Sequence, residues 1–466
     1  MITNLQLYAT TAVIATMSAV VALVLGYPIG NWLAGLRRTR RVVTAVILLP
    51  FLLPPFLVGL AFRPLIGDLL DDSNFGILAI IAAHTFMNAG FIAVVTASSL
   101  IPKDQMEAAQ LDGASRLQAR LAIQLPQQLP ALTAAGLLVA LYSATSYGLV
   151  ITLGQGAIRT LETEIVISAL QQLDLQKAGL LALMQTAMTI AFFALSRKLG
   201  ASPTALFGEI EPQQSRSILG GLLGIGLIGM VLLVAGGVFT RALNSGPGLI
   251  ENFANLGSRG ARDILNISVL EAAGNSLRNL LIAVTISMTV AWLLSAKRVG
   301  LGILAPIGIS PVVIGLSALV LSGYLPTWFA TSWVLLPIVQ SIFLMPLAFQ
   351  IIAPARKSMS GELIEAAKLD GANGIQLFGL VELPTLRKPL LAAAAIVSLG
   401  SLGEFGAASF LAYGSDATLP LVMFRLMSRP GAENLGMAMA AASVFIVLAL
   451  VVVWAISSAQ TSRQDR

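Results

Sequence analysis

The sequence contains no cysteine and only one histidine, His84, among 466 residues. Without cysteine the chain can form neither disulfides nor thiolate metal sites, and one histidine cannot supply a histidine cluster for a metal ion. Charge is also scarce, since charged residues make up 11% of the chain against about 25% in an ordinary soluble domain. Hydrophobic residues make up 56%. These absences exclude several catalytic chemistries and indicate a membrane protein.

Long apolar windows recur along the whole chain. A window of about 20 residues can cross a hydrocarbon core of roughly 30 Å as a helix. The windows lack the alternation of a transmembrane β-barrel. The first one continues too far for a signal-peptide core, so we expect it to remain as a helix. The eleven windows lie near 10–34, 42–62, 76–100, 130–153, 177–196, 217–239, 275–296, 299–322, 331–353, 388–412 and 432–457.

Lysine and arginine gather in alternate connections between these windows, beginning with the run RRTRR at 37–41. The positive-inside rule places such connections in the cytoplasm. This predicts an external N-terminus and a cytoplasmic C-terminus. The same bias accounts for the net charge of +6, so the lipid bilayer is the expected surrounding and no nucleic acid is expected as a partner.

One charged phrase occurs twice. EAAQLDGASRLQARLAIQLP occupies 107–126, and EAAKLDGANGIQLFGLVELP occupies 365–384, which is 258 positions later. The same offset aligns Thr160 with Thr418, and a slightly different one aligns Pro55 with Pro311. Helices one to five therefore correspond to helices seven to eleven.

Because five is an odd number, a sixth helix is needed to return the chain before the second unit begins. The expected fold is an all-α polytopic membrane protein of about 11 transmembrane helices, with two parallel five-helix repeats joined by a connecting helix. The expected units are 1–198, a linker at 199–274 and 275–466. Within the linker, ARDILNISVLEAAGN suggests an amphipathic helix along the membrane surface. Its EAA lacks the later Gly and Leu-Pro, so it is not a third copy.

The repeated phrase predicts a helix, a turn and a second helix. Glu-Ala-Ala favours a helix start, Asp-Gly permits a turn with positive φ, and the proline of Leu-Pro ends the helical register. One copy alone could be an ordinary connecting segment, but two copies in equivalent loops favour a docking surface. The residues expected to contact a partner are Glu107, Ala108, Ala109, Gly113, Leu125 and Pro126, and Glu365, Ala366, Ala367, Gly371, Leu383 and Pro384.

These residues resemble the EAA motif of permease subunits of binding-protein-dependent ABC importers of the type I fold, with two units fused in one chain. The resemblance implies that the loops dock on two copies of a cytoplasmic ATPase, and that an external solute-binding protein delivers a small solute. It also implies the bacterial cytoplasmic membrane, with both loops cytoplasmic. No GxxxxGK[ST] phosphate loop is present, so ATP hydrolysis belongs to a separate subunit; the chain itself is expected to be no enzyme and to need no cofactor. Fused permeases resemble two six-helix units, whereas the first half here lacks an initial helix.

Three polar residues are candidates for the translocation path. Glu404 lies within the tenth window, where an ionisable group is costly; it serves the path or is a hydrogen-bonded acid near the external end. Ser146 is its equivalent in the first half. His84 is a hydrogen-bonded packing residue or a path group.

Prolines interrupt the second and eighth windows at matched positions. Broken helices are tolerated where they line a cavity, so they fit a gate between the halves, and simple kinks are the alternative. The prolines are Pro50, Pro54, Pro55, Pro306 and Pro311.

The solute is the least determined feature. The stretches SYGLVITLGQGAIRTLETEIV and SLGEFGAASFL resemble fused permeases for thiamine, with ferric-iron permeases as the alternative. An ion-driven secondary transporter would need intramembrane ionisable pairs, of which only Glu404 and His84 are candidates. A membrane enzyme would need convergent catalytic groups, and the sequence shows none.

Overall fold

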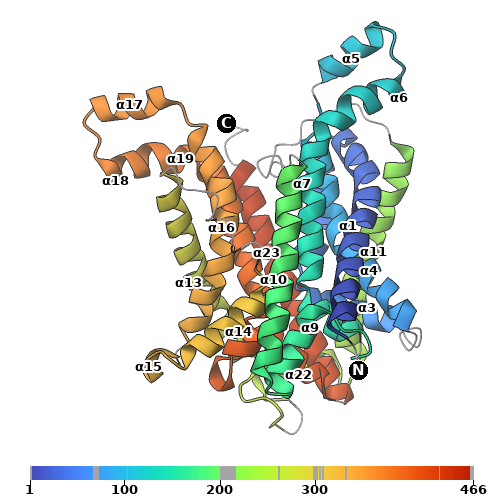
Figure 1. Ribbon diagram of the computed structural model, residues 1–466, viewed down its shortest axis with the longest axis vertical. Coiled ribbons are helices and arrows are strands. Elements are labelled where there is room, and N and C mark those ends of the chain that lie inside the picture. The colour runs from blue at the N-terminus through green and yellow to red at the C-terminus, as the bar shows by residue number, and fades with distance from the viewer. Residues whose placement is uncertain are drawn as a thin grey trace.

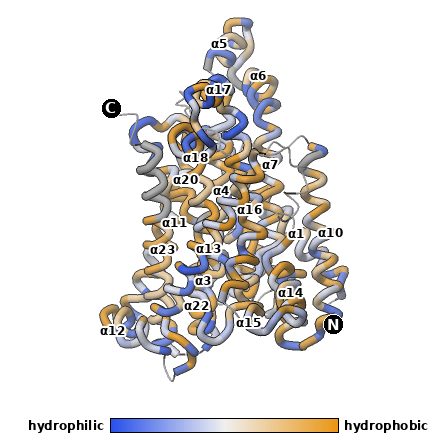
Figure 2. Tube along the Cα trace, turned by 90° about the vertical axis from the view of Figure 1, so that its left-hand side faces the viewer, coloured by the Kyte–Doolittle hydropathy of each residue, from blue (hydrophilic) through white to orange (hydrophobic). Residues whose placement is uncertain are grey.

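Helices form all the regular structure in the residues that the computed structural model describes. The long helices run side by side along the longest axis (Figure 1). Hydrophobic residues dominate their middle portions and hydrophilic ones gather toward the two ends (Figure 2). The described residues are 3–66, 73–101, 103–154, 156–199, 217–260, 263–296, 303, 306, 309–330, 333–429 and 431–461.

Eight helices in this part of the chain are long and apolar enough to cross a membrane. A ninth span is formed if α2 (Arg40–Leu52) and α3 (Pro55–Ile66), which are bent by 90°, cross together. The eight are α1 (Asn4–Gly35), α4 (Ser73–Ser98), α7 (Leu125–Ala144), α10 (Leu175–Lys198), α11 (Ile218–Asn244), α13 (Val269–Ser295), α16 (Leu335–Lys357) and α23 (Ala432–Thr461).

The two remaining predicted windows appear as shorter helices, α14 (Pro311–Ser322) and α20 (Arg387–Leu402). Residues 297–302, at the start of the predicted eighth window, lie outside the described residues, as do 200–216 of the predicted linker. The polytopic all-α fold is confirmed, although not every predicted window is one continuous span.

The predicted helices 130–153 and 388–412 are both broken. After the breaks come the short helices α8 (Tyr147–Leu153) and α21 (Ala408–Leu411). In the second half, the Glu404 carboxylate accepts hydrogen bonds from the backbone N–H groups of Ala407, at 2.6 Å, and Ala408, at 3.0 Å. Residues 403–407 are not helical, and the carboxylate satisfies two backbone N–H groups at the start of α21. The prediction that Glu404 lies inside a helix was therefore wrong.

The internal repeat is visible in equivalent hydrogen bonds. Helices α9 (Leu161–Val166) and α22 (Leu419–Met427) begin at positions 258 residues apart. The backbone N–H of Leu161 donates to Thr11 Oγ1, and that of Leu419 donates to Ser276 Oγ, both at 2.9 Å. Since Thr11 is in α1 and Ser276 in α13, each half uses its first helix to hold the corresponding short helix.

Matched glycines let the chain after each break pack closely against a neighbouring helix, α3 in the first repeat and α14 in the second. A Cβ on Gly148 would lie 2.7 Å from Phe56 Cβ, and a Cβ on Gly406 would lie 2.8 Å from Val312 Cγ2. Phe56 and Val312 directly follow the matched prolines Pro55 and Pro311. A contact this close leaves no room for any side chain, so both repeats need glycine at this point.

The connecting helix α11 contacts α1 of the first repeat and α23 of the second. It is followed by α12 (Leu249–Ala254), and α13 begins at Val269. The Ser268 side chain accepts from the N–H of Glu271, whose carboxylate accepts in return from the N–H of Ser268. This capping box starts the span. The surface helix predicted across this stretch was therefore wrong, because its EAA is the first turn of α13.

Candidate coupling loops and central cavity

The two copies of the repeated phrase project from the same end of the molecule, beyond the long helices (Figure 1). The first loop consists of α5 (Lys103–Leu111) and α6 (Arg116–Ala119). The second consists of α17 (Gly361–Leu369) and α18 (Gly374–Gln376). Helix α1 begins at the opposite end. These segments are called the first and second coupling loops below.

Each coupling loop turns at its glycine by the same geometry. Gly113 has φ +91° and Gly371 has φ +81°. The N–H of Gly113 donates to Gln110 O, and that of Ala114 to Ala109 O. The same two bonds recur 258 positions later. This pair of bonds defines the Schellman motif, in which a left-handed residue ends a helix, so the predicted turn is confirmed.

The helix after each turn begins with a reciprocal cap. Ser115 and Gln118 exchange backbone-to-side-chain hydrogen bonds in the first loop, at 2.9 and 3.3 Å. Asn373 and Gln376 do so in the second, both at 2.9 Å. Two orphan N–H groups are satisfied at each start. Local sequence thus sets both turns and both starts.

The proline of each Leu-Pro pair was predicted to end a helical register, but it lies at the start of a helix. A π-helical segment, Arg120–Gln124 in the first loop and Leu377–Glu382 in the second, precedes each Leu-Pro. Pro126 then lies in the first turn of α7, and Pro384 in the first turn of α19 (Leu383–Thr385). Proline is tolerated there because the first turn needs no N–H partner. The Leu-Pro pair starts a new helical segment as well as ending the previous register.

The predicted contact residues differ in exposure. Glu107, Ala108, Glu365 and Ala366 are exposed, whereas Ala109 is buried. The most exposed apolar side chains of the loops were not among the predicted residues: Leu111 is 88% exposed and Leu369 is 89% exposed. The signal for them was in the sequence, since Leu-Asp-Gly recurs at the same offset. The remaining predicted residues are half-buried or exposed: Gly113, Leu125, Pro126, Ala367, Gly371, Leu383 and Pro384.

The two coupling loops are anchored by different chemistry. In the first, buried Gln124 donates to Asn31 Oδ1 at 3.3 Å and to Gln128 Oε1 at 3.1 Å. The equivalent residue of the second loop is Glu382, which accepts from Arg356 Nη2 at 2.7 Å and Nε at 3.2 Å. An amide network therefore holds one loop and a largely buried ion pair holds the other.

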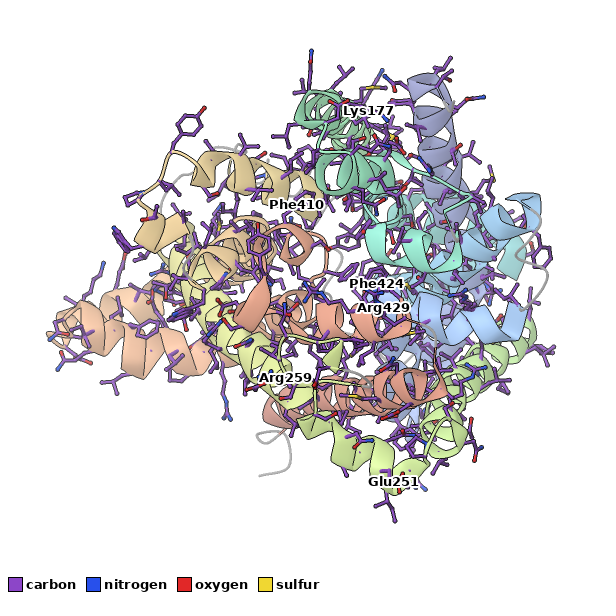
Figure 3. All side chains as sticks on the ribbon, turned by 90° about the horizontal axis from the view of Figure 1, so that it is seen from below. Lys177, Glu251, Arg259, Phe410, Phe424 and Arg429 are labelled. Carbon is purple, nitrogen blue, oxygen red and sulfur yellow. The ribbon has the colours of Figure 1, made fainter. Side chains whose placement is uncertain are left out.

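We expect Glu382→Gln to lower the thermal stability of the purified chain. The substitution keeps the side-chain shape but leaves the Arg356 guanidinium without its counter-charge. Removing one partner of a buried pair costs about 3–5 kcal/mol. Glu251→Gln is the matched control, because Glu251 is exposed in α12 and lies at the edge of the molecule as seen from the end opposite the coupling loops (Figure 3). Equal unfolding midpoints for the two variants would contradict the assigned role of the pair.

A cavity of about 270 Å³ lies between the two repeats. The first repeat contributes residues from α3, α4 and the start of α8. The second contributes residues from α14, α16 and the break after α20. The broken-helix residues Pro54, Pro55 and Pro311 are part of the wall, as is expected where membrane helices are interrupted beside a cavity.

All three predicted path residues line this cavity. Ser146 and Glu404 come from equivalent breaks, and His84 comes from α4. Their side chains are buried. Ser146 Oγ and His84 Nε2 have no hydrogen-bond partner among the described residues, whereas Glu404 accepts two backbone bonds. The structure brings the three together; their part in transport stays a prediction.

Sequence reasoning missed a second acid at the cavity. Glu162, in α9, is fully buried and lines the same wall. Its Oε1 accepts from the Ser310 hydroxyl of the opposite repeat, and its Oε2 has no partner in the described part of the chain. Glu162 lies outside the predicted apolar windows, so no hydrophobic pattern around it indicated that its side chain is buried. Glu162 reaches the cavity because the chain after α8 folds back into α9, which carries this residue.

Two parallel helical repeats, with a cavity between them and a matched pair of loops at one end, define a transport permease. The family model described as binding-protein-dependent transport system inner membrane component matches residues 22–246 and again 273–460. The chain therefore belongs to this family of ABC importer permeases and carries its domain twice.

Several characterised permeases are similar to the chain. The thiamine transport system permease protein ThiP of Brucella abortus (strain 2308) is 25% identical over 425 residues, which cover 86% of this chain and 75% of that protein. The sulfate transport system permease protein CysW of Synechocystis sp. is 30% identical over 216 residues, or 42% of this chain and 75% of that protein. The molybdenum transport system permease protein ModB of Haemophilus influenzae is 30% identical over 190 residues, or 36% of this chain and 81% of that protein.

Proposed function

We propose that the chain forms the translocation path for thiamine in an importer driven by two copies of a cytoplasmic ATPase. The pair of coupling loops supports the proposal that an ATPase drives transport. Both loops lie at the same end of the molecule, have the same turn geometry and expose one leucine each. Two equivalent coupling loops can each contact one of two equivalent partner subunits. Closure of the ATPase pair on ATP would draw the loops together and rock the repeats around the cavity.

The proposed orientation follows from charge. The basic residues beside α2 and around the coupling loops favour the cytoplasm for this end. Helix α1 begins at the other end, which agrees with an external N-terminus. An external solute-binding protein would then deliver the solute to the end that holds α9 and α22. The units 1–198 and 275–466 with their linker stay a prediction.

Thiamine is the first choice of solute because the relatives that align with most of this chain are named as thiamine permeases. The relatives named for sulfate and molybdenum align with less than half of it. Ferric iron remains the alternative from the sequence resemblance. Membership of the family favours ATP-driven import over an ion-driven carrier.

Co-purification tests the proposal. The natural chain has no cysteine, so single cysteines at exposed Ala108 and Ala366 would be the only thiols on the permease. After crosslinking in native membranes, we expect each single-cysteine variant to capture one ATPase subunit, and a variant with both cysteines to capture two. The same cysteine at exposed Glu251, on α12, is the control and should capture no ATPase. Failure of both loop positions to capture it would overturn the proposal.

A further inference from the structure

The cavity between the repeats has two carboxyl groups and neither lysine nor arginine among the described residues that line it. Glu162 comes from the first repeat and Glu404 from the second. His84 is the remaining titratable side chain of the wall apart from two tyrosines, Tyr142 and Tyr147. A solute that enters this space meets acidic groups from both sides and no lysine or arginine.

Glu162 is the less satisfied of the two acids. It is fully buried, and Oε2 lacks a partner among the described residues. Ser146 Oγ and His84 Nε2, on the same wall, also lack partners there. Burial of a polar group without a hydrogen bond is costly, and burial of a charge without a partner is more so. A bound cation would supply what Glu162 lacks.

Glu404 differs from Glu162 because both of its carboxylate oxygens have hydrogen-bond partners in the protein. Its two oxygens accept backbone N–H groups at 2.6 and 3.0 Å, which fix the carboxyl group at the break between α20 and α21. The group is held in one position by the fold and needs no solute to satisfy it. It adds a second acidic group, held in place by the fold, to the lining of the same cavity.

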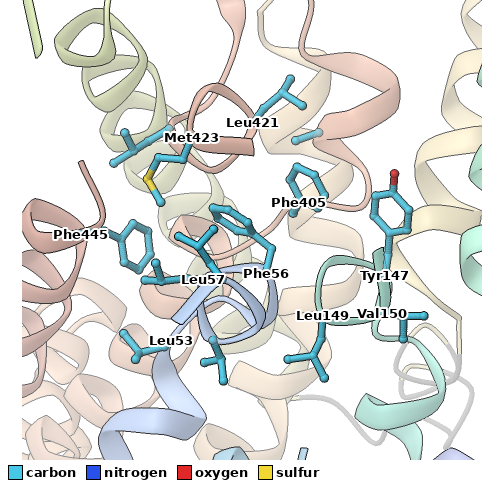
Figure 4. Close-up of a cluster of buried hydrophobic side chains, with 14 of the residues drawn as sticks. Leu53, Phe56, Leu57, Tyr147, Leu149, Val150, Phe405, Leu421, Met423 and Phe445 are labelled. Carbon is cyan, nitrogen blue, oxygen red and sulfur yellow. The ribbon is translucent and has the colours of Figure 1, made fainter. Parts of the chain in front are cut away.

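Aromatic rings from both repeats form another part of the wall. Phe405 stacks on Phe56 with ring centroids 5.5 Å apart, and on Tyr147 with centroids 5.3 Å apart. Phe405 lies between the other two rings (Figure 4). Phe51 and Tyr142 also line the cavity, with ring centroids 6.1 Å apart. Ring faces attract cations, and flat rings stack on one another.

We infer that this cavity is a solute-binding site of the permease itself, and that it selects organic cations that carry a flat aromatic ring, with Glu162 as the counter-charge. The inference rests on the proposed function, because thiamine is one cation of this class. Sulfate or molybdate would meet two acidic groups and no positive charge. The permease would therefore discriminate by charge in addition to any selection by a binding protein.

The test is direct binding to the full chain in lipid nanodiscs, without ATPase or binding protein. Labelled thiamine is the probe, and benzyltrimethylammonium, tetramethylammonium, sulfate and molybdate are the competitors. We expect thiamine to bind, benzyltrimethylammonium to compete, tetramethylammonium to compete less because it has no ring, and neither anion to compete. Glu162→Gln should weaken thiamine binding about tenfold or more, as for a lost charge-assisted contact. Glu162→Asp should restore part of the affinity.

Glu251→Gln is the matched control, since it also removes one acid but lies on the exposed helix α12. Equal thiamine affinity in Glu162→Gln and Glu251→Gln would overturn the inference, and so would absence of thiamine binding to the wild-type chain at millimolar concentration. If Glu162→Gln does not fold, the wild-type competition series decides, because displacement of thiamine by sulfate contradicts charge selection.

The crosslinking capture of an ATPase is independent of the cavity, so the two ideas fail separately. Capture of the ATPase without cation binding overturns only this inference. Cation binding without any ATPase overturns only the proposed energy source.

Discussion

Aspartate in place of both Leu111 and Leu369 is expected to abolish recovery of the ATPase with this chain. Each leucine is nearly 90% exposed at the end of its helix, directly before the Asp-Gly turn. An apolar side chain so exposed at a matched site on both loops would gain free energy when a partner surface covers it. A buried aspartate there would be unpaired and costly. We expect at least a hundredfold loss of affinity, measured by pull-down and by titration of the purified ATPase.

The control for this result is Ile250→Asp. Ile250 is 83% exposed but lies on α12, away from the loops. It introduces the same charge at a similar exposure, and ATPase recovery should be unchanged. Full recovery with the double leucine variant would show that the exposed leucines are not the docking contacts. The single variants should each lose roughly half of the captured ATPase, because one loop remains.

Valine in place of both Gly113 and Gly371 is expected to reduce thiamine uptake close to background while the ATPase still binds. Apart from the adjoining residues, no atom of the described part of the chain lies within 4 Å of a Cβ built at either glycine, so we expect no clash from the substitution. Its effect comes from the backbone, because φ is +91° and +81° and a left-handed conformation costs an L-residue about 1–2 kcal/mol. A β-branched residue is especially unsuited to it. The loop would leave the Schellman geometry and transmit less of the ATPase motion.

The readouts for this variant are labelled thiamine uptake by cells and ATP hydrolysis by the purified complex. Gly374→Val is the matched control, since that glycine also has open space around its Cβ but no positive φ. Asparagine at Gly113 and Gly371 should retain most of the uptake, because asparagine tolerates the left-handed region. Normal uptake by the double valine variant would remove the turn from the coupling mechanism.

The coupling loops could be predicted closely because their determinants are neighbours in the sequence. A turn at Gly113, a cap at Ser115 and a helix start need only residues within a few positions of one another. Repetition at a fixed offset then marked them as functional. Local sequence misled at Glu404, where an apolar run suggested a continuous helix; the helix ends at Leu402, and Glu404 binds backbone N–H groups after the break.

The sequence by itself determined that the protein is a helical membrane protein with an internal repeat and two matched loops. Hydrophobic runs and turn residues depend only on residues that are close together in the sequence. Only the tertiary structure decided which residues face the cavity. Glu162 meets Ser310 from 148 positions away, and Phe405 stacks between two rings of the other repeat. Such contacts arise where separate helices cross, and no spacing along the sequence encodes how two packed repeats meet. The ion pair of Arg356 and Glu382 in one loop, against an amide network in the other, likewise depends on which helices lie beside each loop.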